Sequence, residues 1–184
     1  MERHLLPSHP NTCNTISQPR PDLIYGYPFK AFTQAQHTIL QHFHPEIEFY
    51  SQANVDMWFA FFIVEFKAAA GTRGDLWVAA NQCAGGSAAC LQALNQPNLI
   101  IDEKTCFGLI ANFCYSLAMD NNLGQLYVSW KDGDFYRIQR VASFLLSDTE
   151  HLERLSRCVD SILEWGEIRR WDIHTAVNNI KATQ

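Results

Sequence analysis

The run Phe59–Lys67 constrains the fold of this chain more than any other segment. It reads Phe-Ala-Phe-Phe-Ile-Val-Glu-Phe-Lys and is almost continuously apolar between polar flanks. Such a run predicts a central strand that is covered on both faces of a sheet. Because side chains alternate along a strand, Glu65 and Lys67 share one face, while Val64 and Phe66 lie on the other. The two charged side chains are therefore expected to stand side by side in an apolar setting.

Charges inside such a run need an explanation, because buried charged groups must be paired, bound to a metal or used in function. The alternative is a strand at the edge of the sheet, with both charged groups in water. A Glu-x-Lys string by itself is common and does not decide between these two readings. The surrounding sequence has to decide.

The segments around this strand predict a sheet with flanking helices. Further strands are expected at 22–27, 46–52, 99–101, 106–119, 124–130 and 135–142, the last four as a meander. Helices are expected at 31–43, 76–94, 148–164 and 167–181, with Asp75 as the N-cap of the second and Asp148 or Thr149 as that of the third. The mixture indicates an α/β or α+β class.

The N-terminal segment differs in composition from the rest of the chain. Residues 1–21 carry four prolines among polar residues, namely Pro7, Pro10, Pro19 and Pro21. We expect a flexible N-terminal arm here, followed by a single domain over residues 22–184.

Two aspartates are candidates to join Glu65 in a metal site. Asp22 opens a predicted strand, and two carboxylates on adjacent strands suit a hard divalent cation such as Mg²⁺. Asp56 is the rival, but it reaches Glu65 only through a tight turn near residues 58–60, where no Gly, Pro, Asn or Asp stands. Turns depend on those residue types, so Asp22 is preferred. Lys67 would orient or help to deprotonate a metal-bound water and stabilise charge on a phosphoryl group.

Pro21-Asp22 followed by Phe62-Ile-Val-Glu65-Phe-Lys67 resembles the signature of the PD-(D/E)XK nuclease superfamily. Further segments are similar to uncharacterised fungal proteins assigned to that superfamily: 76–91, 127–130, 139–146 and 162–166. The resemblance covers roughly residues 20–170. It implies a restriction-endonuclease-like fold, with a mixed central sheet flanked by helices. It also implies that Asp22 and Glu65 bind Mg²⁺ or Mn²⁺, that Lys67 is catalytic and that Gln82 on the following helix belongs to the site.

The charge balance bears on the substrate. The formal net charge is −5, whereas non-specific nucleic-acid binders usually carry a basic excess that neutralises phosphates. Contact with DNA or RNA would therefore need a local basic patch or a metal ion. Arg73, Lys131, Arg137 and Arg140 are candidates for such a patch, although a solvated surface is the ordinary role of such residues.

The sequence also predicts a compartment. The N-terminus lacks the apolar stretch of a signal peptide, and no run of about 18 apolar residues predicts a membrane span. No C-x-x-C pair occurs among the six cysteines, which are Cys13, Cys83, Cys90, Cys106, Cys114 and Cys158. We expect an intracellular protein, cytoplasmic or nuclear, with reduced and mostly buried thiols. A zinc site is the less favoured alternative.

Three functional hypotheses follow from these observations. The first is a Mg²⁺-dependent nuclease that uses Asp22, Glu65 and Lys67 to cut DNA or RNA. The second is a nuclease-like scaffold that binds a protein partner without catalysis. The third is an enzyme of fungal metabolism that acts on a small molecule, with Glu65 and Lys67 as acid and base in an apolar pocket.

Overall fold

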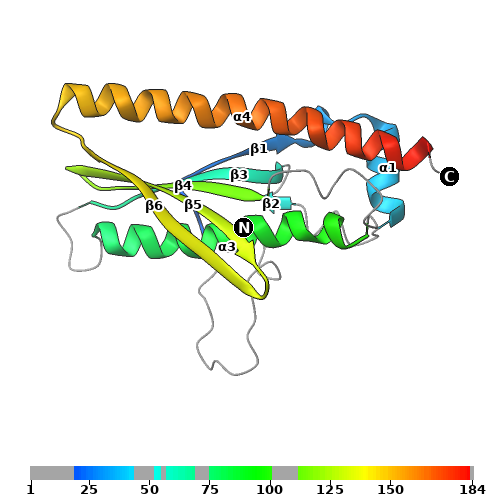
Figure 1. Ribbon diagram of the computed structural model, residues 1–184, viewed down its shortest axis with the longest axis horizontal. Coiled ribbons are helices and arrows are strands. Elements are labelled where there is room, and N and C mark those ends of the chain that lie inside the picture. The colour runs from blue at the N-terminus through cyan, green and yellow to red at the C-terminus, as the bar shows by residue number, and fades with distance from the viewer. Residues whose placement is uncertain (1–18, 44–51, 55–56, 69–74, 101–111, 183–184) are drawn as a thin grey trace.

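A mixed β-sheet forms the middle layer of the molecule, with one long helix along each face (Figure 1). The computed structural model describes residues 19–43, 52–54, 57–68, 75–100 and 112–182. The strands are β1 (Leu23–Pro28), β2 (Gln52–Asn54), β3 (Met57–Phe66), β4 (Phe113–Met119), β5 (Leu123–Asp132) and β6 (Phe135–Leu145). The helices are a 3₁₀ turn η2 (Phe29–Ala31), α1 (Gln34–Phe43), α3 (Leu76–Ile100) and α4 (Thr149–Ala182).

The strands lie in the order β1-β3-β4-β5-β6, and β2 also pairs with β3. The pair β3–β4 is parallel, and the other pairs are antiparallel. Helix α3 lies in the connection between the two parallel strands, as a parallel pair requires. A mixed sheet with flanking helices is an α+β fold, and the predicted class is confirmed.

The central strand is β3, as the apolar run predicted. Residues 58–65 are all buried, which requires cover on both faces of the sheet. Helix α3 packs on one face, where a Cβ on Gly86 would stand 2.5 Å from Cδ1 of Ile63. Helix α4 packs on the other face, where the ring of Trp165 meets the rings of Phe61 and Tyr115.

A bulge interrupts the pairing of β1 with β3. The register shifts between Tyr25 and Tyr27, and opposite this point Phe59 adopts a φ of 48°. A bulky residue with positive φ is a genuine outlier, so the backbone is strained here. Gly26 allows the close approach, because a Cβ there would stand 2.8 Å from the carbonyl oxygen of Trp58.

Helix α3 begins as predicted but ends later. Asp75 caps it, its Oδ1 accepting a 3.0 Å hydrogen bond from the backbone N–H of Val78. The helix then runs for 25 residues and includes Pro97, Leu99 and Ile100. The strand predicted at 99–101 is therefore wrong for its first two residues, and Ile101 lies outside the described residues.

Helix α4 is one continuous helix of 34 residues, and the prediction of two helices at 148–164 and 167–181 is wrong. Gly166, between the two predicted helices, lies inside the single helix against Phe61. The predicted start is confirmed, because Asp148 Oδ1 accepts a 3.1 Å hydrogen bond from the N–H of His151.

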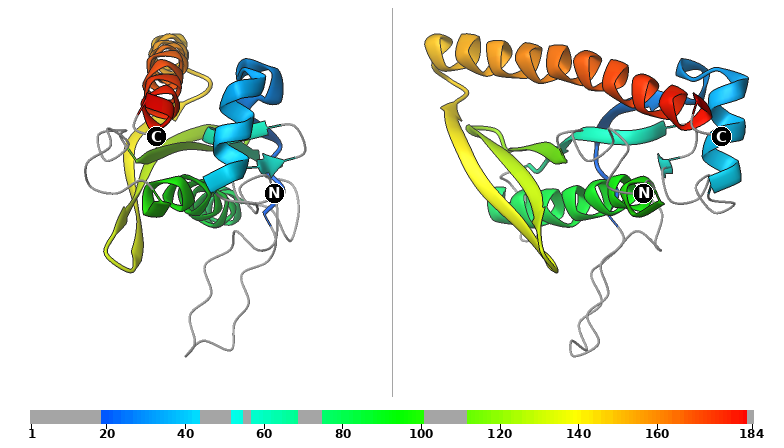
Figure 2. Two further views of the ribbon diagram at one scale, coloured as in Figure 1. Left: turned by 90° about the vertical axis from the view of Figure 1, so that its right-hand side faces the viewer. Right: turned by 45° about the vertical axis from the view of Figure 1, so that its right-hand side comes forward.

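The predicted antiparallel meander is confirmed for β4, β5 and β6. In the first turn, Oδ1 of Asp120 accepts hydrogen bonds of 2.8 Å from the N–H groups of Asn122 and Leu123. In the second turn, Gly133 has a φ of 58°, which glycine adopts at little cost. Figure 2 shows the β5–β6 hairpin reaching past α3.

Several predicted features fall on residues that the structure does not describe. They are residues 46–51 of a predicted strand, residues 106–111 of another, Asp56, Arg73, Cys13 and Cys106. Within the described ranges, no helix combines the length and the apolarity that crossing a membrane requires.

Candidate functional site

Glu65 is the buried carboxylate of the candidate site. It stands near the C-terminal end of β3, and only 1% of its surface is exposed. Neither carboxylate oxygen has a hydrogen-bond partner among the described residues. Buried polar groups are normally hydrogen-bonded, so a carboxylate with both oxygens unpartnered suggests a group kept ready for a ligand.

Asp22 lies beside Glu65, one residue before the neighbouring strand β1. Leu23 pairs with Val64 in the antiparallel ladder, so the next residues outward, Asp22 and Glu65, stand opposite each other. Oδ2 of Asp22 accepts a 2.7 Å hydrogen bond from the backbone N–H of Phe66, which fixes the aspartate against β3. The structure thus brings together the two carboxylates that the sequence had paired across 42 intervening residues.

Lys67 completes the group from the same strand. Its Nζ lies 3.6 Å from Oε2 of Glu65, and its side chain is 23% exposed. The same Nζ donates to the carbonyl oxygen of Phe66 at 3.2 Å, and the backbone N–H of Lys67 donates to Met119 at 2.9 Å. The ammonium group therefore lies between the buried carboxylate and solvent.

The surroundings raise the pKa of Glu65 above its usual value of 4.5. Burial is the largest cause, since it removes water from the charged form, and the negative charge of Asp22 adds to it. The positive charge of Lys67 acts in the opposite direction but does not offset the other two effects. A positive ion between the two carboxylates would favour the ionised form of Glu65 and so oppose this rise in its pKa.

Gln82 lies on the second turn of α3, the helix over the face of the sheet that carries Glu65. Its Oε1 is buried and has no hydrogen-bond partner among the described residues. Its neighbour Cys83 is fully buried, and the charges of Glu65 and Lys67 both act on the pKa of the thiol. This turn of the helix therefore lies near the carboxylate.

A family model described as a domain of unknown function, DUF7924, matches residues 2–177. The chain belongs to the DUF7924 family. No curated protein and no solved structure matches it. The family match covers all four candidate site residues of this DUF7924 chain.

The residues of this DUF7924 site fit a hard divalent ion better than a soft one. Two carboxylates on adjacent strands supply oxygen ligands, and Mg²⁺ and Mn²⁺ prefer such ligands and keep several waters. Among the described residues, no cluster of three or more His, Cys, Asp or Glu side chains is placed to hold a metal. A two-carboxylate site of the Mg²⁺ kind is compatible with that finding, whereas a cysteine-rich zinc site is not supported by it.

The position of two residues near Glu65 was not predicted from the sequence. Cys83 of α3 and Ser116 of β4 are fully buried, and the Ser116 hydroxyl acts on the pKa of the Cys83 thiol. One signal was present in the sequence: Ala79, Cys83, Gly86 and Cys90 form a stripe of small residues with helical spacing, typical of a helix that packs closely on a sheet. The register of β4 could not be predicted from the sequence, so Ser116 could not be placed.

Proposed function

We propose that this DUF7924 chain is a Mg²⁺-dependent phosphodiesterase of the PD-(D/E)XK type that cuts nucleic acid. One observation carries the proposal. A buried carboxylate, Glu65, which accepts no hydrogen bond from the described residues, stands opposite Asp22 and 3.6 Å from the ammonium group of Lys67. Two acids and one base that converge in this way are the minimum set for metal-assisted hydrolysis of a phosphodiester.

The roles follow from the positions of the groups. Asp22 and Glu65 would hold the ion, which supplies an activated water and neutralises charge on the phosphate. Lys67, whose Nζ is partly exposed, would donate hydrogen bonds to the phosphate oxygens as negative charge builds on them. The Phe66–Asp22 hydrogen bond keeps the aspartate in place for this task.

The chemistry balances without a further reactant. The oxygen of a water forms a new bond to phosphorus, one ester P–O bond breaks, and the leaving alkoxide takes up a proton, which balances the proton that the attacking water releases. The raised pKa of Glu65 does not prevent metal binding, because a bound cation favours the ionised carboxylate. The protein would act inside the cell, where the free thiols of the described cysteines stay reduced.

The proposal is tested by incubation with plasmid DNA, single-stranded DNA and RNA, each with Mg²⁺, with Mn²⁺ and with EDTA. Wild-type protein is expected to cut at least one substrate only with metal. Lys67→Met should lower the rate about 100-fold or more, as for the loss of one group that stabilises transition-state charge. Lys30→Met is the matched control, since Lys30 is an exposed lysine of the 3₁₀ turn η2 outside the site.

Two outcomes would overturn the nuclease proposal. One is cutting by Lys67→Met at the wild-type rate. The other is no cutting of any substrate by a folded wild-type protein. The second outcome, together with a failure to bind Mg²⁺, would favour a nuclease-like scaffold for a protein partner, which the net charge of −5 supports.

A further inference from the structure

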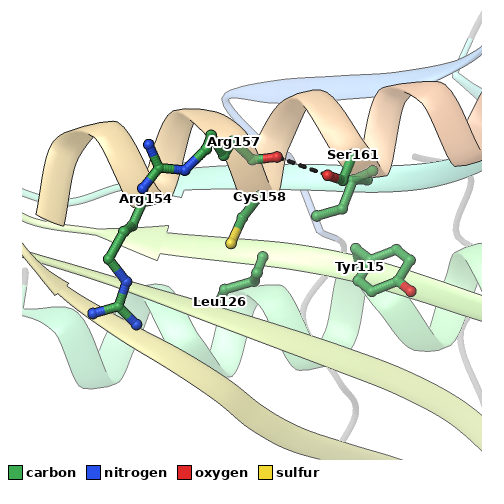
Figure 3. A pocket seen from close by; sticks show the side chains of 7 residues that line it. Tyr115, Leu126, Arg154, Arg157, Cys158 and Ser161 are labelled. Carbon is green, nitrogen blue, oxygen red and sulfur yellow. Dashed lines mark hydrogen bonds between the residues drawn. The ribbon is translucent and has the colours of Figure 1, made fainter. Parts of the chain in front are cut away.

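A pocket opens on the face of the sheet opposite Glu65. It lies between the N-terminal half of α4 and strands β4 and β5, and it has a volume of about 480 Å³ (Figure 3). Tyr115 and Ser116 are neighbours on β4, so they point to opposite faces. Tyr115 lines the pocket, whereas Ser116 lies beside Cys83 of α3. The pocket is therefore separate from the proposed catalytic site.

This pocket, which is wide open to solvent, arises from the side chains that α4 presents to the sheet. Leu155 and Ile162 are buried and fill the space beneath the helix. Between them stand the smaller residues Cys158 and Ser161, both of which line the pocket. Short side chains leave room above Leu126 of β5, and Figure 3 shows the thiol of Cys158 pointing toward that leucine.

The lining combines an apolar floor with a cationic side. Tyr115, Leu126 and Ile162 supply apolar surface, and Arg154 and Arg157 supply two guanidinium groups. Arg157 pairs with Glu153 at 3.7 Å. Arg154 has no carboxylate partner in the part of the chain that the structure describes, and in Figure 3 its side chain hangs from α4 toward the strands. The unpaired cation thus stands at the edge of apolar surface.

We propose that this pocket binds a small anionic amphiphile, a carboxylate with an apolar chain. Its volume lies within the range of about 300–1,000 Å³ that is usual for small-molecule sites. Arginine binds a carboxylate through two parallel hydrogen bonds, and Arg154 is the free cation placed to do so. The apolar chain would lie over Leu126, between Cys158 and Ile162. Charge complementarity selects this occupant, because the chain is acidic as a whole and the pocket is not.

Decanoate is the test ligand, and decanol is its uncharged counterpart. The wild-type chain should bind decanoate by isothermal titration calorimetry, and Arg154→Gln should weaken the affinity about tenfold or more, as expected for one lost charge-assisted hydrogen bond. Decanol should bind both proteins equally. Arg137→Gln is the control, because Arg137 is an exposed arginine of β6 that pairs with Asp132 away from the pocket.

Cys158 reports the location of binding. In a background with Cys13 and Cys106 replaced by serine, decanoate should slow the alkylation of Cys158 by iodoacetamide about tenfold at saturation. Ser161→Phe fills the pocket from the exposed side of α4 and should abolish both binding and protection. The inference is overturned if decanoate does not bind, if Arg154→Gln and Arg137→Gln bind it as the wild type does, or if binding leaves Cys158 unprotected.

Discussion

Gly166 of α4 lies directly against the ring of Phe61 in β3. A Cβ on this glycine would overlap the ring. The ring has no room to yield, because it is stacked on Tyr27 at 5.5 Å and meets Trp165 edge-on at 5.9 Å. The hydroxyl of Tyr27 also donates a 2.7 Å hydrogen bond to the carbonyl oxygen of Gly166. The glycine therefore sets how closely α4 approaches the sheet.

Gly166→Ala is expected to destabilise the protein. In an exposed helix this change would stabilise by about 1 kcal/mol through helix propensity. Here the added methyl group overpacks the core, which typically costs about 1–3 kcal/mol. Because the methyl group would overlap the Phe61 ring, the cost should fall near the upper end, at about 2–3 kcal/mol, and the net loss should be about 1–2 kcal/mol. Urea unfolding followed by circular dichroism measures it. Ser156→Ala, on the exposed side of α4, is the control, and equal stability of Gly166→Ala and wild type would contradict the packing.

Glu65→Gln is expected to stabilise the protein at neutral pH. The pKa of Glu65 is raised in the folded state, chiefly by burial, so the folded protein holds this proton more tightly than the unfolded chain. Wild-type stability is therefore fully present below the unfolded value of 4.5 and falls as pH rises through the folded pKa. The glutamine variant does not titrate and avoids this loss.

Urea unfolding from pH 4 to pH 8 checks this pH dependence. The difference in free energy of unfolding between Glu65→Gln and wild type should grow as pH rises and then level off. Glu164→Gln, an exposed substitution on α4, separates the effect of burial from that of a lost charge. A difference that stays the same across the pH range would rule out titration of Glu65 as its cause.

Mg²⁺ is expected to raise the stability of the wild type through Asp22 and Glu65. A ligand that binds only the folded state at 100 times its Kd stabilises by about 2.7 kcal/mol. Asp22→Asn keeps an acceptor for the N–H of Phe66 but removes a charge, so its gain from Mg²⁺ should be largely lost. Thermal unfolding with and without Mg²⁺ measures the effect, with Asp160→Asn on α4 as control. A gain of equal size in all three proteins would place the ion elsewhere.

The parts of the fold that depend on residues close together along the chain could be predicted from the sequence. The central strand follows from a local apolar run, and the start of α3 follows from the Asp75 cap. The continuity of α4 does not, because the role of Gly166 depends on Phe61, which is distant along the chain. A glycine in a helix and a glycine that ends one look alike until the contact is known.

The candidate site was likewise predictable where it depends on local sequence and not where it depends on contacts between distant residues. Turn chemistry favoured Asp22 over Asp56, and Asp22 lies beside Glu65 in the structure, whereas Asp56 is outside the described residues. The approach of Ser116 and Cys83 was not predictable, because it depends on the register of the parallel β3–β4 pair. The pocket beneath α4 was not predictable for a similar reason. It depends on small residues of α4 that lie over Leu126 of β5, which is distant along the chain.

Cysteine reactivity should divide the described thiols into two classes. Burial raises the pKa of Cys83 to about 12, so at pH 8 only about one thiol in 10⁴ is a reactive thiolate. Cys90 has a raised pKa because of its hydrogen bond with Cys114 and its burial, and both thiols are fully buried. Cys158 is partly exposed, and it should react with iodoacetamide first.

Mass spectrometry of the alkylated protein, in the background without Cys13 and Cys106, checks this order. Under native conditions we expect modification of Cys158 at least 100-fold faster than that of the three buried thiols, since these react only when the structure opens. In concentrated urea all four should react at similar rates, because unfolding removes the burial that separates them. Fast native labelling of Cys83 would show that this side of α3 is not packed against the sheet, and would contradict the packing of α3 over Glu65.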